Sequence, residues 1–154
     1  MFSKEERKTI NAAFWTRFKE QAGVNKGANG KKVNWVNYPT NLKQLYVRLH
    51  ADTEIARFSI DVQAKDDGVR AIVWEQMTEL KKVMEEEMNT SGNWEETAYN
   101  TAGQKISRIS WTLEDVNMYV KEDQDKIFGF FIPLLVGFDR FYTTYDEILI
   151  GLVR

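Results

Sequence analysis

Two runs of alternating apolar and polar residues, joined by a short polar turn, constrain the fold of this chain more than any other feature. Apolar residues occupy the odd positions from Leu45 to Leu49 and the even positions from Ala56 to Val62. Alternation with a period of two is typical of strands that bury one face and expose the other. The short turn makes the two strands antiparallel, so the pattern predicts a β-hairpin with one apolar and one polar face.

The rest of the chain predicts helices around this hairpin and a second hairpin after it. Ser3 and Glu6 form a capping-box pattern at a helix start, and Pro133 is expected to kink or restart the last helix. The further predicted elements are a helix over 4–22, a strand over 33–38, a helix from about 68 to Asn89, a hairpin of strands 94–99 and 105–113, and a helix over about 122–150. This order, α-β-β-β-α-β-β-α, predicts an α+β fold with a largely antiparallel sheet and helices packed on one face.

Length and composition narrow the class of protein. The 154 residues are typical of one domain, 1–154, and a hydrophobic fraction of 43% supplies a core. The absence of cysteine excludes disulfides and thiolate metal sites. The charged N-terminal segment, and an apolar run over 127–138 that is shorter than the ~20 residues a bilayer needs, predict a cytoplasmic protein without membrane contact. A net charge of −2 argues against a protein that coats nucleic acid but leaves a local basic patch possible.

The segment Ser59–Gly68 raises the question of a metal-dependent nuclease. Asp61 ends a strand and is followed by Gln63-Ala64-Lys65, the acid and (Asp/Glu/Gln)-x-Lys arrangement with which restriction-type nucleases hold Mg²⁺. With Asp52-Thr53 as a two-residue turn, Asp61 faces Gln44, and no carboxylate lies opposite the triplet. The acids at the turn are roughly 30 Å away at ~3.3 Å per strand residue. A Mg²⁺-dependent nuclease that uses Asp61 and Lys65 is therefore the alternative, not the leading hypothesis.

The polar face of the hairpin gives the leading candidate site. The same register places Arg48 directly opposite Arg57, which is unfavourable unless an acid or a bound anion lies between them. The strand at 105–113 turns Arg108 outward, so three arginines share a surface with Tyr46 and His50. Guanidinium groups suit phosphates and aromatic rings suit stacked bases, which predicts an anion or phosphodiester platform. The alternative is a solvated sheet face whose arginines are neutralised by neighbouring acids.

Short motifs along almost the whole chain resemble one known family. They are FWTRF at 14–18, NWVNYP at 34–39, the hairpin end IDV at 60–62, LKKVMEEE at 80–87, NWEE at 93–96, SRI at 107–109 and FDRF at 138–141. In this order they resemble domain-of-unknown-function family 4268, which occurs in bacteria and archaea. The resemblance implies an α+β accessory domain, in some members fused to restriction- or nuclease-like regions, without an established activity. Arg108 falls where the family pattern has an arginine.

We therefore expect a non-enzymatic binding or interaction domain that contacts nucleic acid or another phosphate-bearing ligand through Arg48, Arg57 and Arg108. No catalytic residue, metal or cofactor is expected for this function. A further alternative is a protein-partner or oligomerisation module, such as a homodimer, that uses the aromatic C-terminal helix.

Overall fold

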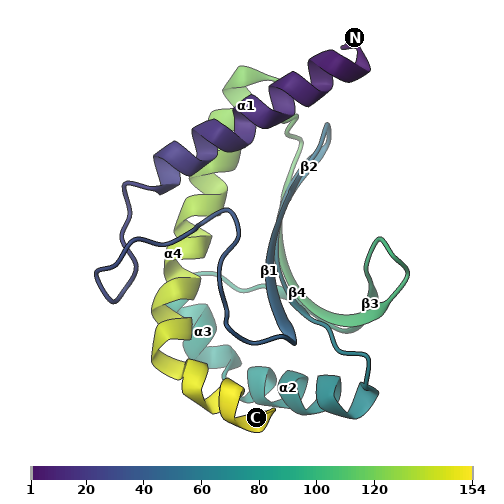
Figure 1. The fold of residues 1–154 in the computed structure, drawn as a ribbon, viewed down its shortest axis with the longest axis vertical. Helices are drawn as coiled ribbons and strands as arrows, with labels where there is room; N and C mark the ends of the chain where they lie inside the picture. Colours follow the sequence, from purple (N-terminus) through teal and green to yellow (C-terminus); the bar gives the residue numbers. More distant parts are fainter. Residues whose placement is uncertain (1, 154) are drawn as a thin grey trace.

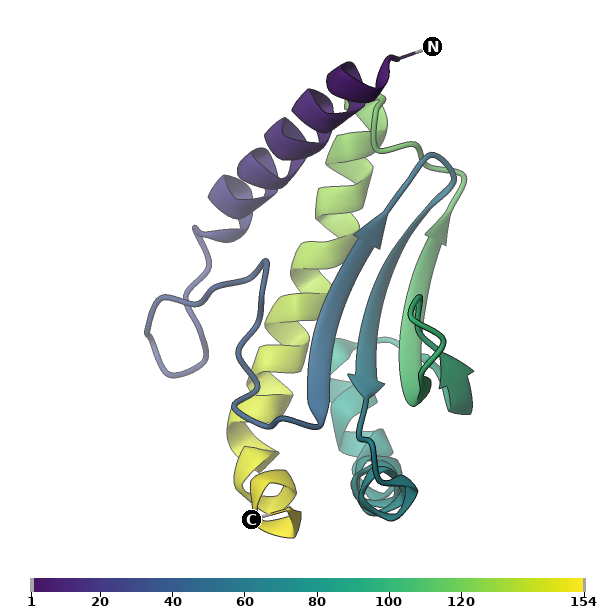
Figure 2. The same ribbon diagram turned by 45° about the vertical axis from the view of Figure 1, so that its right-hand side comes forward.

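Four antiparallel strands form one sheet, and helices cover one of its two faces (Figure 1). The computed structural model describes residues 2–153. In chain order the elements are α1 (Lys4–Ala22), β1 (Leu45–Ala51), β2 (Ile55–Val62), α2 (Asp67–Glu79), α3 (Lys81–Met88), β3 (Asn93–Tyr99), β4 (Lys105–Glu114) and α4 (Lys121–Leu152). The strand order is β1-β2-β4-β3. Helices α1, α3 and α4 lie on one side, and α2 crosses the lower end of the sheet (Figures 1 and 2). The predicted α+β class is confirmed.

The first hairpin forms with the predicted faces but with a different register. Arg48 pairs with Ser59 and His50 with Arg57, so the predicted pairing of Arg48 with Arg57 is wrong by two residues. The cause is the turn: the Asp52 carboxylate accepts the N–H groups of Glu54 and Ile55, both at 2.8 Å, and closes a turn longer than Asp52-Thr53. A shift of two residues preserves which side chains point to the core, so the face assignment stands.

The segment predicted as a strand at 33–38 belongs instead to the long connection between α1 and β1. Its aromatic side chains are buried individually: Trp35 donates its indole N–H to the Asn25 carbonyl at 3.0 Å, and Tyr38 bonds to Asp139 of α4. The segment does not form a strand despite its composition, because buried aromatic side chains with hydrogen bonds of their own hold it in place and no strand lies beside it.

The helix predicted between 68 and Asn89 is divided at Leu80 into α2 and α3. The break lets α3 pack along α4 while α2 turns beneath the sheet (Figure 1). The approach of α3 to α4 is close, since a Cβ on Gly137 would lie 2.8 Å from the Met88 Cα. The second hairpin, by contrast, turns at Asn100–Gly103 as predicted, with Gly103 at a φ of 79°.

Helix α4 is the centre of the core. Phe131, Phe138 and Phe141 are fully buried, and α4 contacts α1, α2, α3 and β2. It runs without interruption through Pro133, so the proline does not restart the helix. By length and composition α4 could cross a membrane, but 56% of its most apolar 18-residue stretch is buried inside this fold.

A buried carboxylate attaches the 23–44 connection to α4. Asp139 is 3% exposed and accepts the Tyr38 hydroxyl at 2.6 Å and the Ala28 N–H at 2.7 Å. Burial, and next the hydrogen bond to Asp139, raise the pKa of Tyr38 far above its ordinary value. Asp139 thus fixes two distant points of a connection that has no strand or helix of its own.

We expect Asp139→Asn to lower the free energy of unfolding by about 2–3 kcal/mol, because the amide replaces one acceptor oxygen with a donor that faces a buried donor. Tyr38→Phe should cost about 1–2 kcal/mol, and the double variant less than the sum of the two. Urea denaturation of the four proteins measures this coupling.

Asp125→Asn is the matched control, because Asp125 is largely exposed and pairs only with Arg17 at the surface. It should change stability by less than about 0.5 kcal/mol. Strict additivity of Tyr38→Phe and Asp139→Asn would show that their hydrogen bond does not hold the connection in place.

Candidate anion-binding face

The sheet face opposite the helices carries polar side chains from all four strands. We call this set the arginine face: it comprises Tyr46, Arg48 and His50 of β1, Arg57, Ser59 and Asp61 of β2, Arg108, Ser110 and Thr112 of β4, and Glu95 of β3. Strand alternation puts them on this side, because the neighbouring positions are the ones that enter the core. The β3–β4 hairpin curls away from the helices, so the face is concave (Figure 1). The five site residues predicted from the sequence all lie on it.

Asp61 is the most buried group of the arginine face and joins three strands. Its side chain is 0% exposed, and its two oxygens accept Arg108 Nε and Nη2 at 2.8 and 2.9 Å and Arg48 Nη1 at 2.6 Å. Burial alone would raise the pKa of Asp61, but the hydrogen bonds from Arg108 and Arg48 outweigh it and lower the pKa below its ordinary value. The hydrogen bond to Asp61 likewise raises the pKa of Arg108. Two of the three predicted arginines are therefore neutralised in part by one acid.

Arg57 differs from the other two arginines of the face. It lies between His50 of β1 and Thr112 of β4, is half-buried, and its Nε is buried without a hydrogen-bond partner. Within residues 2–153 it is the one partly buried arginine with no carboxylate at ion-pair distance. The Arg57 side chain therefore differs from Arg48 and Arg108, whose guanidinium groups are bonded to Asp61.

The neighbouring histidine is oriented by the turn that set the hairpin register. His50 Nε2 lies 2.8 Å from the Asp52 Oδ2. Partial burial would raise the pKa of Asp52, but the Ile55 N–H, the His50 ring and the Glu54 N–H together lower the pKa to about 2. The other ring nitrogen of His50 has no hydrogen-bond partner within residues 2–153, and His50 lies opposite Arg57 across β1 and β2.

Strand parity predicts that Ser59 and Ser110 lie on this face, whereas Gln63 and Gln104 were not predicted as part of it. Gln63 accepts from Arg48 at 2.9 Å and donates to Gln104 at 2.8 Å, and Ser59 pairs with Ser110 across β2 and β4. The Gln63–Gln104 bond has no sequence signal, because it depends on β2 lying beside β4.

The geometry gives little support to a Mg²⁺ site at Asp61. Asp61 faces Tyr46 and not Gln44, and its oxygens already accept three hydrogen bonds from two arginines. Lys65 lies beyond the end of β2, exposed. Across residues 2–153, no three His, Asp or Glu side chains gather in a way that could hold a metal ion.

The fold and this face define an α+β domain with a one-sided helical layer and an open, arginine-bearing sheet surface. The chain belongs to a family described as a domain of unknown function (DUF4268), whose match spans residues 10–146 and confirms the family resemblance. No curated protein and no solved structure matches the chain.

We expect Asp61→Ala to lower the free energy of unfolding by about 3–5 kcal/mol, because it leaves two arginines close together without their acid. Arg108→Ala should cost more than Arg48→Ala, since the Arg108 side chain is 16% exposed and makes two bonds to Asp61, whereas Arg48 is 38% exposed and makes one. Chemical denaturation at neutral pH ranks the three variants. Equal losses of unfolding free energy for Arg48→Ala and Arg108→Ala would contradict the larger contribution expected of Arg108.

The same carboxylate should contribute to acid sensitivity. The folded-state pKa of Asp61 is lowered, so its contribution to stability is complete above the unfolded-state pKa of ~3.9 and is lost as the pH falls through the folded value. Asp61→Asn should therefore show a flatter dependence of unfolding free energy on pH below about 4 than the unchanged protein. An unchanged slope would rule out this linkage.

Proposed function

We propose that this chain is a non-enzymatic binding domain that takes a phosphate-bearing ligand on its arginine face, with Arg57 as the anchor and nucleic acid as the first ligand class to test. The observation that supports this is the half-buried Arg57 on the concave arginine face, whose guanidinium has no carboxylate at ion-pair distance within residues 2–153. Phosphate oxygens match the planar fork of a guanidinium and can accept from its terminal Nη groups, whereas the Nε is enclosed by protein.

The neighbours of Arg57 suit the same ligand. Thr112 offers an exposed hydroxyl on one side, and His50 offers a ring nitrogen on the other. Arg48 lies over the Tyr46 ring at 4.6 Å and keeps N–H groups beyond those that bond to Asp61 and Gln63. Asp61 has a positioning role in this proposal, because it holds Arg48 and Arg108 in place and limits the positive charge of the face.

The balance of charge predicts a modest electrostatic contribution. Three arginines on the face stand against Asp61 and Glu95, and the whole chain carries −2. One or two phosphates contacted at Arg57 and Arg48 would give a logarithmic salt slope of about −0.7 to −1.4 for a single strand. This is far shallower than the slope of a protein that follows many phosphates.

Fluorescence anisotropy with a labelled 12-nucleotide single strand, at two salt concentrations, tests the proposal. Arg57→Ala should weaken binding about 10- to 100-fold, because it removes charge-assisted hydrogen bonds worth about 1.5–3 kcal/mol. Arg57→Lys keeps the charge but loses the fork, so its affinity should fall between those of the unchanged protein and Arg57→Ala. Labelled duplex DNA, single-stranded RNA and inorganic phosphate as competitor distinguish the ligand classes.

Arg7→Ala is the matched control, because Arg7 is exposed on α1 and the charge change is the same. It should leave the affinity unchanged. Equal weakening by Arg7→Ala and Arg57→Ala would show unspecific attraction, and the absence of binding to every phosphate-bearing probe at low salt would refute the proposal.

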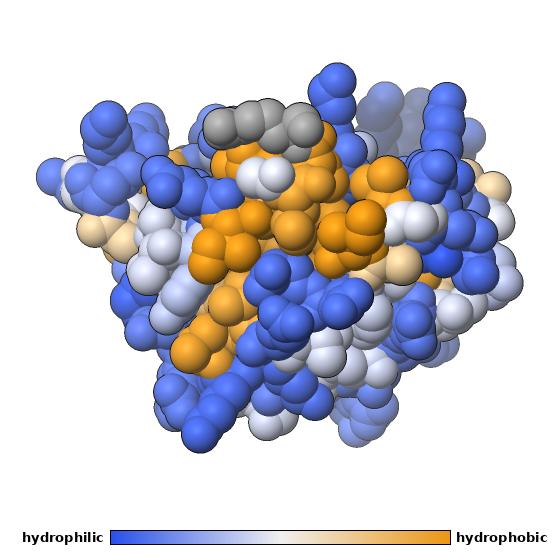
Figure 3. All heavy atoms as spheres, turned by 90° about the horizontal axis from the view of Figure 1, so that it is seen from below, coloured by the Kyte–Doolittle hydropathy of each residue, from blue (hydrophilic) through white to orange (hydrophobic). Residues whose placement is uncertain are grey.

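A homo-oligomer through the C-terminal helix is a second candidate, with a narrower basis than the sequence predicted. The aromatic side chains of α4 point into the core, but Ile148 and Leu152 near its end are 46% and 38% exposed. Apolar side chains gather at this end of the molecule (Figure 3). Sedimentation of Ile148→Glu beside the unchanged chain tests whether this patch joins two copies.

A further inference from the structure

The outer edge of β1 is an open set of backbone hydrogen-bonding groups. β1 is an edge strand. The bonds from Gln63 N–H to the Gln44 carbonyl and from Asp52 N–H to the Ile55 carbonyl show that the even-numbered residues of β1 direct their backbone groups toward β2. The N–H and C=O groups of Val47, Leu49 and Ala51 therefore point away from the sheet. Within residues 2–153 these outward groups have no hydrogen-bond partner. Figure 2 shows β1 as the outermost strand on this side.

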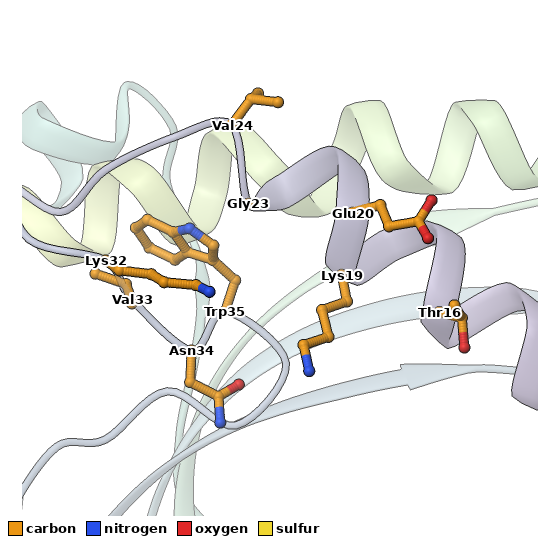
Figure 4. Close-up of a pocket in the computed structure, with 9 residues that line it drawn as sticks. All are labelled: Thr16, Lys19, Glu20, Gly23, Val24, Lys32, Val33, Asn34 and Trp35. Atoms are coloured by element: carbon orange, nitrogen blue, oxygen red, sulfur yellow. The ribbon is translucent and has the colours of Figure 1, made fainter.

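Three cavities that share lining residues lie between this edge and the end of α1. The first cavity, of about 850 Å³, lies between α1 and the 23–44 connection and is floored by Trp35 (Figure 4). A cavity of about 250 Å³ shares Thr16, Lys19 and Asn34 with it, and one of about 510 Å³ shares Asn37 with the second. The cavity of about 510 Å³ is also lined by Leu45, Tyr46 and Val47 of β1. We call this succession the α1–β1 groove.

The charge of the groove is mainly positive. Lys19 and Lys32 line its first cavity and Lys43 its last, and none of the three is in an ion pair within the described part of the chain. Glu20 is the one acid among the lining residues, and Figure 4 shows its carboxylate directed away from Lys19 and Lys32. At the β1 edge, Arg48 adds a further positive side chain on the arginine face.

We propose that the β1 edge and the α1–β1 groove bind an extended acidic segment of a partner protein, which adds a fifth strand to the sheet. Main-chain bonds to Val47, Leu49 and Ala51 hold the segment, as in other cases of strand addition to an open edge. Its alternate side chains contact the half-buried Val47 and Leu49 on one side and approach Arg48 on the other. Beyond Leu45 the segment continues into the groove, where acidic residues meet the lysines.

A second copy of this chain fits the edge less well. No residue from Leu45 to Ala51 is acidic, so pairing two β1 edges would bring two arginine- and histidine-bearing strands together. The charge of the edge and of the groove both favour an acidic partner instead.

The probe for this proposal is a fluorescein-labelled 12-residue peptide of four Glu-Val repeats followed by four glutamates. Anisotropy measures its affinity, and the backbone amide resonances of Val47, Leu49 and Ala51 should shift on binding. A peptide of the same sequence with N-methylated valines keeps the charge but cannot pair as a strand, and it should bind at least tenfold more weakly. A peptide with lysine in place of glutamate should not bind.

Leu49→Pro removes an outward N–H without removing a bond to β2, so the hairpin can persist while peptide binding falls at least tenfold. Ala51→Pro repeats this test with a smaller loss of packing. Lys19→Ala/Lys32→Ala/Lys43→Ala should weaken binding at least tenfold at low salt. The matched control is Lys8→Ala/Lys82→Ala/Lys121→Ala, three exposed lysines outside ion pairs, which should leave the affinity unchanged.

Equal binding of the plain and N-methylated peptides would overturn strand addition, and the absence of binding at millimolar peptide would overturn the whole proposal. A dimer in sedimentation that Leu49→Pro dissociates would assign the edge to a second copy and also overturn it. None of these outcomes depends on Arg57, so the anion-binding proposal stands or falls separately.

Discussion

The buried carboxylate of Asp61 is the interaction on which the polar side of this sheet depends. One acid on β2 holds an arginine from β1 and another from β4, so it connects the three strands through side chains as well as through their backbone ladders. An isolated buried carboxylate would be costly, and two uncompensated arginines side by side would repel each other; together they satisfy one another. This arrangement gives the arginine face a fixed geometry. Within residues 2–153 it leaves Arg57 as the arginine of this face without a carboxylate partner.

A second buried carboxylate has a comparable role on the helical side, with a different solution to the same physical problem. Asp139 has no arginine and is instead stabilised by a phenol and a backbone N–H from the 23–44 connection. Neutral donors of this kind tie a long irregular segment to α4 without adding charge to the core. The segment they fix forms one wall of the α1–β1 groove. Two aspartates thus organise two different surfaces, the arginine face and the α1–β1 groove.

The differences between prediction and structure have specific causes. The two-residue error in the first hairpin came from the turn, where the Asp52 carboxylate captures two N–H groups and lengthens it. The segment 33–38 has the composition of a strand, but buried anchors at Trp35 and Tyr38 hold it apart from the sheet. The break at Leu80 could not be predicted, because no glycine or proline marks it in the sequence. It accompanies the packing of α3 on α4.

The α+β class, both hairpins and the first and last helices could be predicted from the sequence, as could the position of the five predicted side chains on one sheet face, because periodicity and strand parity are local properties. The family followed from the resemblance of short motifs along the chain. Which charged side chains pair with one another depends on the tertiary structure. Asp61 joins Arg48 and Arg108 because of a register set by a turn and a strand order that places β2 beside β4. The same register leaves Arg57 without a carboxylate partner within residues 2–153, and the strand order leaves β1 at an edge of the sheet. Such partnerships depend on which segments are neighbours in space, and no local pattern along the chain encodes that.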